Sequence, residues 1–389
     1  KRGLNDLIRE CDEELQAIKF FDTNSYEKSV TIQAMKMTLE ALVRFAGRFA
    51  GLADEMAVKE TDPVRRKELQ EIAETCRWVP ANPARNFKEA LQTVWFIFLT
   101  TSPSPTTTIG RFDQYMYPYY RADIDTGRIT DEEVLEYLQC FRLKVMEIGN
   151  ISGKEVRKRG VGRARWHNMT IGGIKSDGND ATNELSYLVL EALMRCPTTH
   201  HTITMRVAES TPESLILKGI EAQGRGLSMP AFIGDPSYIN FFTTYGVSLE
   251  HARDYCITGC LDANLQGRSR AISIGMFITI KTLEFFLNDG VDPKTGLRVG
   301  NKVGNLDTFE TYDEFHAAFM KEFTGYMSMG AERNNAEAMS YGYSLPNPLI
   351  SALMVDGIKI GLDFYKRDYE LQNNNLMNPV GMLNLGNSL

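Results

Sequence analysis

The sequence is poor in cysteine and has no long apolar run. Its six cysteines are spread over 389 residues, and none forms the C-x2-C pair of a structural metal site. The longest apolar run lies around Val94 to Thr100, far short of the roughly 20 residues needed to span a bilayer. These absences exclude a disulfide scaffold and a membrane span, and they predict a cytoplasmic protein with reduced thiols.

Basic residues are also too few to indicate a nucleic-acid partner. The chain has 43 Lys and Arg against 50 Asp and Glu, a net charge of -7, and no block of basic residues to follow a phosphate backbone. A phosphate loop, a dinucleotide fingerprint, H-E-x-x-H and G-x-S-x-G are all missing. The composition is otherwise close to the globular average. We therefore expect a folded protein, either one large α/β barrel or two to three domains.

Apolar periodicity predicts helices in the first part of the chain. Apolar residues recur at spacings of three and four through residues 34–49, and a further helix is expected from Asn86 to about Thr101. Segment 102–108 contains two prolines and is predicted to be a loop, because proline cannot continue a helix. We expect a helical layer over about residues 1–150.

From Trp166 onward the pattern changes to strands that alternate with single helices. This alternation is typical of βαβ units, so it predicts an α/β fold with a parallel sheet or barrel. A ligand site is then expected at the carboxyl ends of the strands. The predicted strands are 168–173, 202–207 and 230–233, and the predicted helices are 181–195, 212–223, 276–288, 312–335 and 349–364.

Two cysteines lie close together between residues 254 and 270. Gly259 directly precedes Cys260 and permits a tight turn that would present its sulfur at the tip of a loop. We interpret Cys256 as a buried small hydrophobe, as most free cysteines are. For Cys260, the residues around it leave both a buried small hydrophobe and a thiol that faces a cavity open.

Three separated segments carry a family resemblance. They are residues 110–120, Ile171–Gly173 with the following 177–184, and 252–255 leading into Gly259 and Cys260. In this order they resemble the glycyl radical enzymes related to pyruvate formate-lyase. The resemblance implies a ten-stranded α/β barrel of two parallel half-barrels surrounded by helices, only part of it in this chain. It also implies that Cys260 becomes a thiyl radical fed by a glycyl radical on a C-terminal loop.

One family pattern is missing from these residues. The glycyl loop, Arg-Val-x-Gly followed by an aromatic residue, is absent, and Arg298-Val299-Gly300 lacks the pattern. We therefore expect residues 1–389 to be a barrel-domain fragment without the C-terminal glycyl radical domain, with the barrel and cysteine loop in about 151–389. The resemblance implies no cofactor or metal bound by this chain. It implies a radical S-adenosylmethionine iron–sulfur activating enzyme as partner, and a homodimer with or without small accessory subunits.

Residues after the thiol favour one branch of the family. Pyruvate formate-lyase has two adjacent cysteines, whereas here Gly259 precedes Cys260. Family dehydratases and several decarboxylases place Glu two residues after the cysteine, where this chain has Asp262. Apolar residues around Ile274 replace a polar His-Asp pair of the diol dehydratases. We therefore expect a pocket lined by Ile274 that takes a hydrocarbon, as in the benzylsuccinate and alkylsuccinate synthases, which add a hydrocarbon to fumarate.

Three arginines complete the predicted site. A guanidinium matches a carboxylate bidentately, so Arg268 and Arg270 are candidate fumarate ligands, with loop capping as the alternative. Arg206, near the exit of the strand at 202–207, is a candidate pocket residue.

Several polar and aromatic residues have a structural interpretation instead. His167, His200 and His201 are interpreted as structural, the tyrosines of 115–120 as core, and Asp113 as the partner of an arginine.

Two other functions remain open. One is a dehydratase or decarboxylase of the same family with Asp262 as proton carrier. The other is a catalytically silent scaffold subunit, which the missing glycyl loop suggests.

Overall fold

The computed structural model describes residues 2–19, 21, 23–101, 106–148, 154, 158, 166–199, 201–259, 261–270, 272–371 and 375–389. The chain divides into two compact units, and each is described by itself. The first comprises Lys1–Arg270 and Asn347–Gln372, and the second comprises Ala271–Pro346 and Asn373–Leu389.

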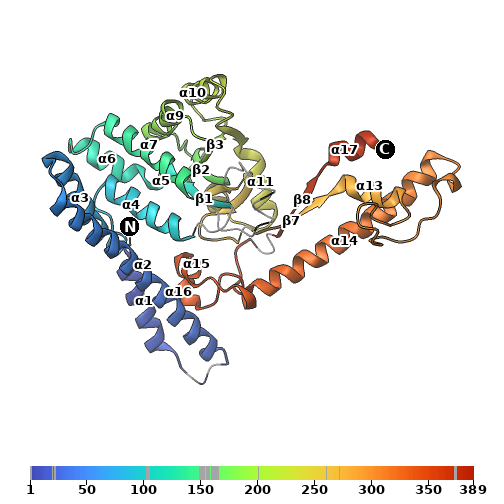
Figure 1. Cartoon of the computed structure of the whole chain (residues 1–389), viewed down its shortest axis with the longest axis horizontal. Helices are drawn as coiled ribbons and strands as arrows, with labels where there is room; N and C mark the ends of the chain where they lie inside the picture. The colour runs from blue at the N-terminus through green and yellow to red at the C-terminus, as the bar shows by residue number, and fades with distance from the viewer. Residues whose placement is uncertain are drawn as a thin grey trace. The chain divides into compact units, whose positions relative to one another are not determined.

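Long helices open the first unit (Figure 1). Apolar residues at helical spacing bury one face of the second of them, including Ile32, Leu39 and Leu42. Asp62 caps the third, because its carboxylate accepts the amide of Val64. These helices confirm the periodicity prediction, and they are α1 (Leu4–Ala17), α2 (Ser25–Lys59), α3 (Pro63–Trp78) and α4 (Phe87–Thr101).

A parallel sheet of four strands follows, with its strands side by side in chain order. In its register, Asn168 lies beside Thr108 and Thr202, and Thr170 lies beside Thr204. The sheet confirms the predicted parallel α/β arrangement. Its strands are β1 (Thr106–Arg111), β2 (Trp166–Gly172), β3 (Thr202–Val207) and β4 (Ala231–Gly234).

Helices connect these strands and bury the main apolar core. The core joins α4 and the connecting helices to β2 and β3, through residues such as Phe98, Phe141, Leu190 and Met205. Asn183 caps one helix by accepting the amides of Leu185 and Ser186, so it begins at Glu184 and not at 181. The connecting helices are α5 (Phe112–Tyr115), α6 (Tyr117–Asp125), α7 (Asp131–Glu147), α9 (Glu184–Arg195) and α10 (Glu213–Gly224).

The first unit ends with a short antiparallel hairpin and four short helices. The hairpin lies within residues 254–270, the segment that the sequence analysis singled out for its two cysteines. Its strands are β5 (Tyr255–Thr258) and β6 (Asp262–Leu265), and the helices are α11 (Asp235–Thr244), α12 (Leu249–Arg253), α15 (Pro348–Leu353) and α16 (Gly357–Ile360).

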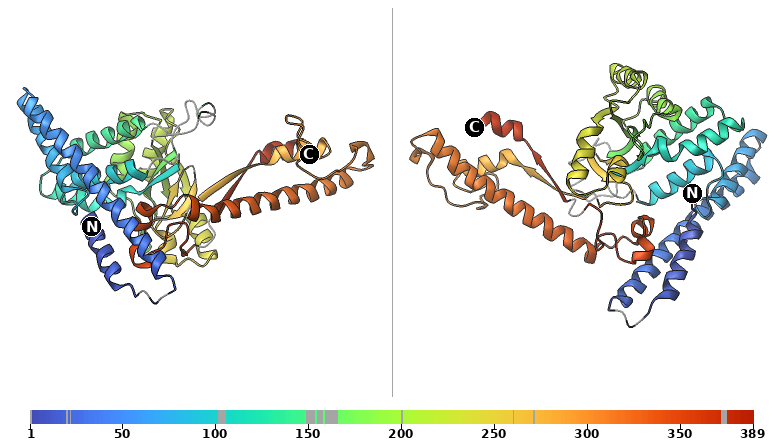
Figure 2. Two further views of the ribbon diagram at one scale, coloured as in Figure 1. Left: turned by 60° about the horizontal axis from the view of Figure 1, so that its bottom comes forward. Right: turned by 180° about the vertical axis from the view of Figure 1, so that it is seen from behind.

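The second unit is built on one pair of parallel strands packed against a long helix, α14 (Figure 2). A separate apolar cluster around Phe286 and Phe319 holds this helix against α13. Its elements are β7 (Ile272–Ile278), α13 (Thr279–Leu287), η1 (Leu306–Thr308), α14 (Tyr312–Ser344), β8 (Asn375–Val380) and α17 (Met382–Ser388).

Four further sequence predictions need correction. Thr106–Thr108 belongs to strand β1 and not to a loop, while 102–105 lies outside the described residues. The helix expected from Met276 begins at Thr279, because Met276–Ile278 pairs with β8. The helix expected at 312–335 continues to Ser344. The one expected at 349–364 is two helices, interrupted near Asp356, whose φ is +54°.

Asp113 ties three elements of the first unit together. Its fully buried carboxylate accepts the Gly172 amide at 2.8 Å, the Ser186 hydroxyl at 2.6 Å and the Gln114 amide at 3.0 Å. These neutral donors, and not the expected arginine, form its described hydrogen bonds, and Arg111 acts on it only by electrostatic attraction. Burial raises the pKa of Asp113.

Replacing Asp113 should therefore destabilise the fold. We expect Asp113→Ala to lower the free energy of unfolding by on the order of 2–4 kcal/mol, because buried donors lose their acceptor. The midpoint of urea unfolding measures the change. Asp125→Ala, an exposed member of a pair with Arg121, is the control and should cost less than about 1 kcal/mol. Equal losses in the two variants would contradict the role of Asp113.

Candidate active site

The hairpin of β5 and β6 is the centre of the candidate site. Tyr255 pairs with Leu265, and Thr258 pairs with Asp262, so the connection runs through residues 259–261. Gly259 has a φ of +60°, a left-handed conformation that glycine adopts without a side-chain clash. Cys260 itself lies outside the described residues, and its catalytic role remains a prediction.

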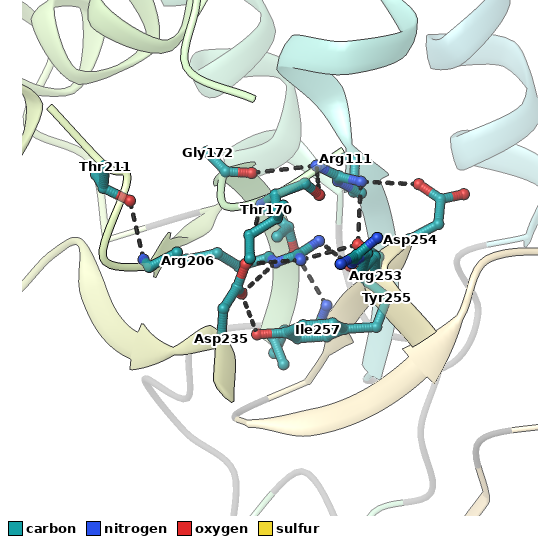
Figure 3. Close-up of polar contacts among 12 residues, drawn as sticks. Arg111, Thr170, Gly172, Arg206, Thr211, Asp235, Arg253, Asp254, Tyr255 and Ile257 are labelled. Carbon is teal, nitrogen blue, oxygen red and sulfur yellow. Dashed lines mark hydrogen bonds and ion pairs between the residues drawn. The ribbon is translucent and has the colours of Figure 1, made fainter. Parts of the chain in front are cut away.

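A buried ion pair holds the start of this hairpin (Figure 3). Arg206 of β3 donates from Nε to Oδ1 of Asp235 at 2.7 Å, and from Nη2 to Oδ2 at 2.9 Å. Neither side chain is exposed. Nη1 of Arg206 donates to the Tyr255 carbonyl at 2.8 Å, and Nη2 to the Arg253 carbonyl at 2.9 Å. The pair therefore fixes the backbone of β5 to the end of β3.

Tyr255 closes the same network. Its hydroxyl donates to Oδ1 of Asp235 at 2.7 Å, and its ring lies beneath the Arg206 guanidinium, 3.9 Å from ring centroid to Cζ. Burial raises the pKa of Tyr255, so the phenol stays protonated. Gly173 gives the guanidinium its space, since a Cβ there would lie 2.5 Å from Nε of Arg206.

A second buried arginine joins the loop before β5 to the sheet. Arg111, at the end of β1, donates from Nη1 to Oδ1 of Asp254 at 2.9 Å, and from Nη2 to the carbonyls of Gly172 and Ile174 at 3.3 and 3.1 Å. Burial lowers the pKa of Arg111, and the neighbouring Arg206 lowers it further. Sequence analysis did not single out Arg111, although it lies in the Gly-Arg-Phe-Asp segment that carried the resemblance.

Threonines on β1 and β2 hold the next part of the hairpin. The Ile257 amide donates to Oγ1 of Thr170 at 3.0 Å, and the Thr108 hydroxyl donates to the Ile257 carbonyl at 2.8 Å. Thr108 also lies 3.7 Å from the sulfur of Cys256. Cys256 is fully buried, as expected, and burial raises its pKa to about 11, so it stays a neutral thiol.

Asp262 opens strand β6 and is half-buried. Burial raises the pKa of its carboxyl group, so a larger share of it is protonated at neutral pH than for an ordinary aspartate. On the preceding residue, the Leu261 carbonyl accepts the Tyr238 hydroxyl at 3.1 Å. Asp262 is therefore close to Cys260 in the sequence, and its raised pKa makes it better suited to hold a proton for donation than an ordinary aspartate.

The three predicted arginines have protein partners. Arg206 is fully buried in its ion pair, which favours a structural role over a substrate contact. Arg270 donates to the Tyr365 carbonyl at 2.9 Å. Arg268 interacts electrostatically with Glu370. Burial by itself would raise the pKa of Glu370, but hydrogen bonds from His251 and the Ser248 amide, together with the charge of Arg268, lower it overall. A fumarate contact for Arg268 or Arg270 remains a prediction.

Some of the other predicted residues are buried in the core, and the remaining ones lie outside the described residues. Ile274 lies in β7, in the second unit, and its side chain lies outside the described residues, as does His200. His167 and His201 are buried against Phe98 and Phe141, which agrees with a structural interpretation. The tyrosines of 115–120 are buried in, or pack against, the main core.

A membrane-spanning helix and a cluster of metal-ligating side chains were both searched for among the described residues. No helix among them is both long and apolar enough to cross a bilayer. Within the same residues, no three His, Cys, Asp or Glu side chains are grouped as metal ligands.

Comparison with known proteins places this fold in a family. The family profile described as "Pyruvate formate lyase-like" matches residues 1–389. The chain belongs to this family. The predicted family and the partial α/β barrel are therefore confirmed.

The relatives carry out different reactions from the one expected. Isethionate sulfite-lyase of Oleidesulfovibrio alaskensis is 34% identical over 84% of this chain and 40% of its own length. Trans-4-hydroxy-L-proline dehydratase of Clostridioides difficile is 28% identical over 100% of this chain and 50% of its own length. The glycerol-bound B12-independent glycerol dehydratase from Clostridium butyricum superposes with a TM-score of 0.86, at 29% identity, over 95% of this chain and 47% of that one.

These findings favour the alternative branch of the sequence analysis, a dehydratase or decarboxylase, over the expected fumarate addition. The similar proteins include dehydratases and a sulfite-lyase, and they do not support fumarate addition or hydrocarbon degradation. The chain spans about half the length, or less, of the curated relatives it matches.

Breaking the buried ion pair should release the hairpin. We expect Asp235→Ala to lower the free energy of unfolding by about 3–5 kcal/mol, because it leaves the buried Arg206 charge without its partner. Urea unfolding of the chain measures this loss. Glu221→Ala, which removes an exposed i,i+4 partner of Arg225, is the control and should cost less than about 1 kcal/mol. A loss at Asp235 no larger than the control's would refute the anchoring role.

Proposed function

We propose that this chain is part of a glycyl radical enzyme that eliminates a small leaving group, such as water, from a hydroxylated substrate. The observation that carries the proposal is Asp262, a half-buried carboxyl group with a raised pKa two residues after Cys260. The similarity to dehydratases and a sulfite-lyase supports the same reaction class. Water elimination needs a group that can give up a proton near the reacting carbons.

The proposed steps balance on a 1,2-diol. The sulfur of Cys260, as a thiyl radical, takes a hydrogen atom from the carbon that bears the first hydroxyl. The neighbouring hydroxyl then leaves as water with the proton of Asp262, and the carboxylate recovers a proton from the first hydroxyl. The resulting carbonyl-bearing carbon radical takes the hydrogen atom back from Cys260. The thiyl radical and the protonated Asp262 are thereby restored.

The radical itself must come from outside these 389 residues, which lack the glycyl loop pattern. We propose that a glycyl residue of the complete protein supplies it, after installation by a radical S-adenosylmethionine activating enzyme. The protein's contribution is to hold the reacting atoms in place and to exclude water from the radical.

Cys260 should be indispensable, while Cys256 should not be. In the complete, anaerobically activated protein, we expect Cys260→Ser to remove measurable turnover, because an O–H bond is too strong to be broken and re-formed in each cycle. Cys256→Ala should retain most of the activity, since that thiol is a buried neutral packing group. Product formation from 1,2-propanediol, glycerol, isethionate and trans-4-hydroxy-L-proline is the readout, with fumarate plus a hydrocarbon as a separate arm. Turnover only in the fumarate arm would overturn the proposal.

The carboxyl group of Asp262 should set one limb of the pH profile. Because burial raises its folded pKa and the protonated form is the donor, kcat should fall as pH rises through that pKa. Asp262→Asn should lower kcat by about 100-fold or more and remove this limb. Asp125→Asn, a change at an exposed aspartate of α6, is the control and should keep the wild-type pH profile. A full-rate Asp262→Asn enzyme with the wild-type profile would rule out the proton-carrier role.

A further inference from the structure

Asn168 connects the parallel sheet to the turn of the hairpin. Its side chain lies on β2 and is almost completely buried, at 1% exposure. Nδ2 donates to the Gly259 carbonyl at 3.3 Å and to Oγ1 of Thr204 at 2.8 Å. Since a carbonyl oxygen only accepts, the contact with Gly259 determines which end of the amide faces the turn.

This contact acts at the last described residue before Cys260. The peptide unit is planar, so holding the Gly259 carbonyl orients the whole peptide that leads into residue 260. The other sheet contacts described above, from Thr108 and Thr170, reach Ile257, which is two residues earlier. Asn168 therefore contacts the peptide unit that leads directly into Cys260, whereas the threonines contact residues before Gly259.

The carbonyl oxygen of the Asn168 side chain, Oδ1, indicates that packing alone does not account for an asparagine at this position. Its Oδ1 is buried and has no hydrogen-bond partner among the described residues. An unsatisfied buried polar atom costs on the order of 1–3 kcal/mol, and a leucine of similar size would avoid that cost. The structure keeps an amide here, and the described use of that amide is to donate to Gly259 and Thr204.

We propose that Asn168 is a positioning residue for Cys260, acting through the Gly259 carbonyl. The inference deepens the proposed function and rests on it for its kinetic readout. A second readout, the reactivity of the Cys260 thiol, depends only on the placement of the sulfur.

The test compares variants of Asn168 with a control variant of the same sheet, all in the complete protein. Asn168→Leu removes the donor to Gly259 at similar volume, and Asn168→Ala is made alongside it in case leucine prevents folding. Thr202→Val is the matched control, because it removes one side-chain hydrogen bond within the same sheet, to the His167 carbonyl, without touching the hairpin. We expect Asn168→Leu to lower kcat by about tenfold or more, with KM nearly unchanged, as for a small misplacement of a reacting group.

The thiol readout uses the protein before activation. We expect the rate at which iodoacetamide labels Cys260 to change severalfold in Asn168→Leu and to stay near wild type in Thr202→Val. Peptide mass spectrometry follows the labelling, with the exposed Cys140 as internal reference. Equal kcat and equal labelling in the two variants, at matched thermal stability, would overturn the positioning role. If the wild-type protein turns over none of the hydroxylated substrates, the proposed function fails, and the labelling rates alone decide the inference.

Discussion

The buried pair of Arg206 and Asp235 is the interaction on which the candidate site depends. Two charges removed from water are tolerated only when each is matched by good geometry and further hydrogen bonds. Both conditions are met here, because the guanidinium binds the carboxylate bidentately and also donates to two backbone carbonyls. Those carbonyls belong to Arg253 and Tyr255. The hydrogen bonds that stabilise the buried Arg206 charge therefore also fix the start of the hairpin.

The same constraint explains why polar side chains line part of a parallel sheet. Parallel strands are usually buried on both faces and read as apolar runs, yet β1 and β2 carry Thr108, Asn168 and Thr170. Residues two apart in a strand share a face, and side chains from these strands reach successive parts of the hairpin. A hairpin packed against a sheet has backbone groups that its own two strands do not pair, and burial makes each of them costly. The polar side chains provide those missing partners.

Periodicity predicted the parts of the fold whose cause is local. Strands β2 and β3 and helix α9 follow from apolar runs and helical spacing, and Asn183 shortens α9 through a cap that lies next to it in sequence. Strand β1 was missed because Thr106–Thr108 follows two prolines and is held in the sheet by pairing with β2, about 60 residues away in sequence. The two prolines predict a loop only for the residues just before β1. Strand β1 itself forms because it pairs with β2.

The candidate site was harder to predict for the same reason. The residue types of Arg206 and Asp235 are visible in the sequence, but their pairing spans 29 positions and depends on how β3 and α11 meet. A buried arginine with a full set of protein partners and one that awaits a substrate carboxylate look identical in a sequence. The hydrogen-bond partners distinguish them, and they changed the interpretation of Arg206.

The choice of branch depends on which residues near Cys260 in the sequence are used to infer the substrate. Ile274 follows Cys260 by 14 positions, and its apolar character predicts an apolar substrate pocket. That prediction rests on nearness in sequence alone, because the side chain of Ile274 lies outside the described residues. Asp262 is a stronger guide, because it lies in the hairpin itself and burial shifts its pKa in the direction that an elimination requires. A protonated carboxyl group two residues after Cys260 can supply the proton that elimination needs, whereas radical addition needs no proton transfer. The raised pKa of Asp262 therefore supports the elimination that we propose.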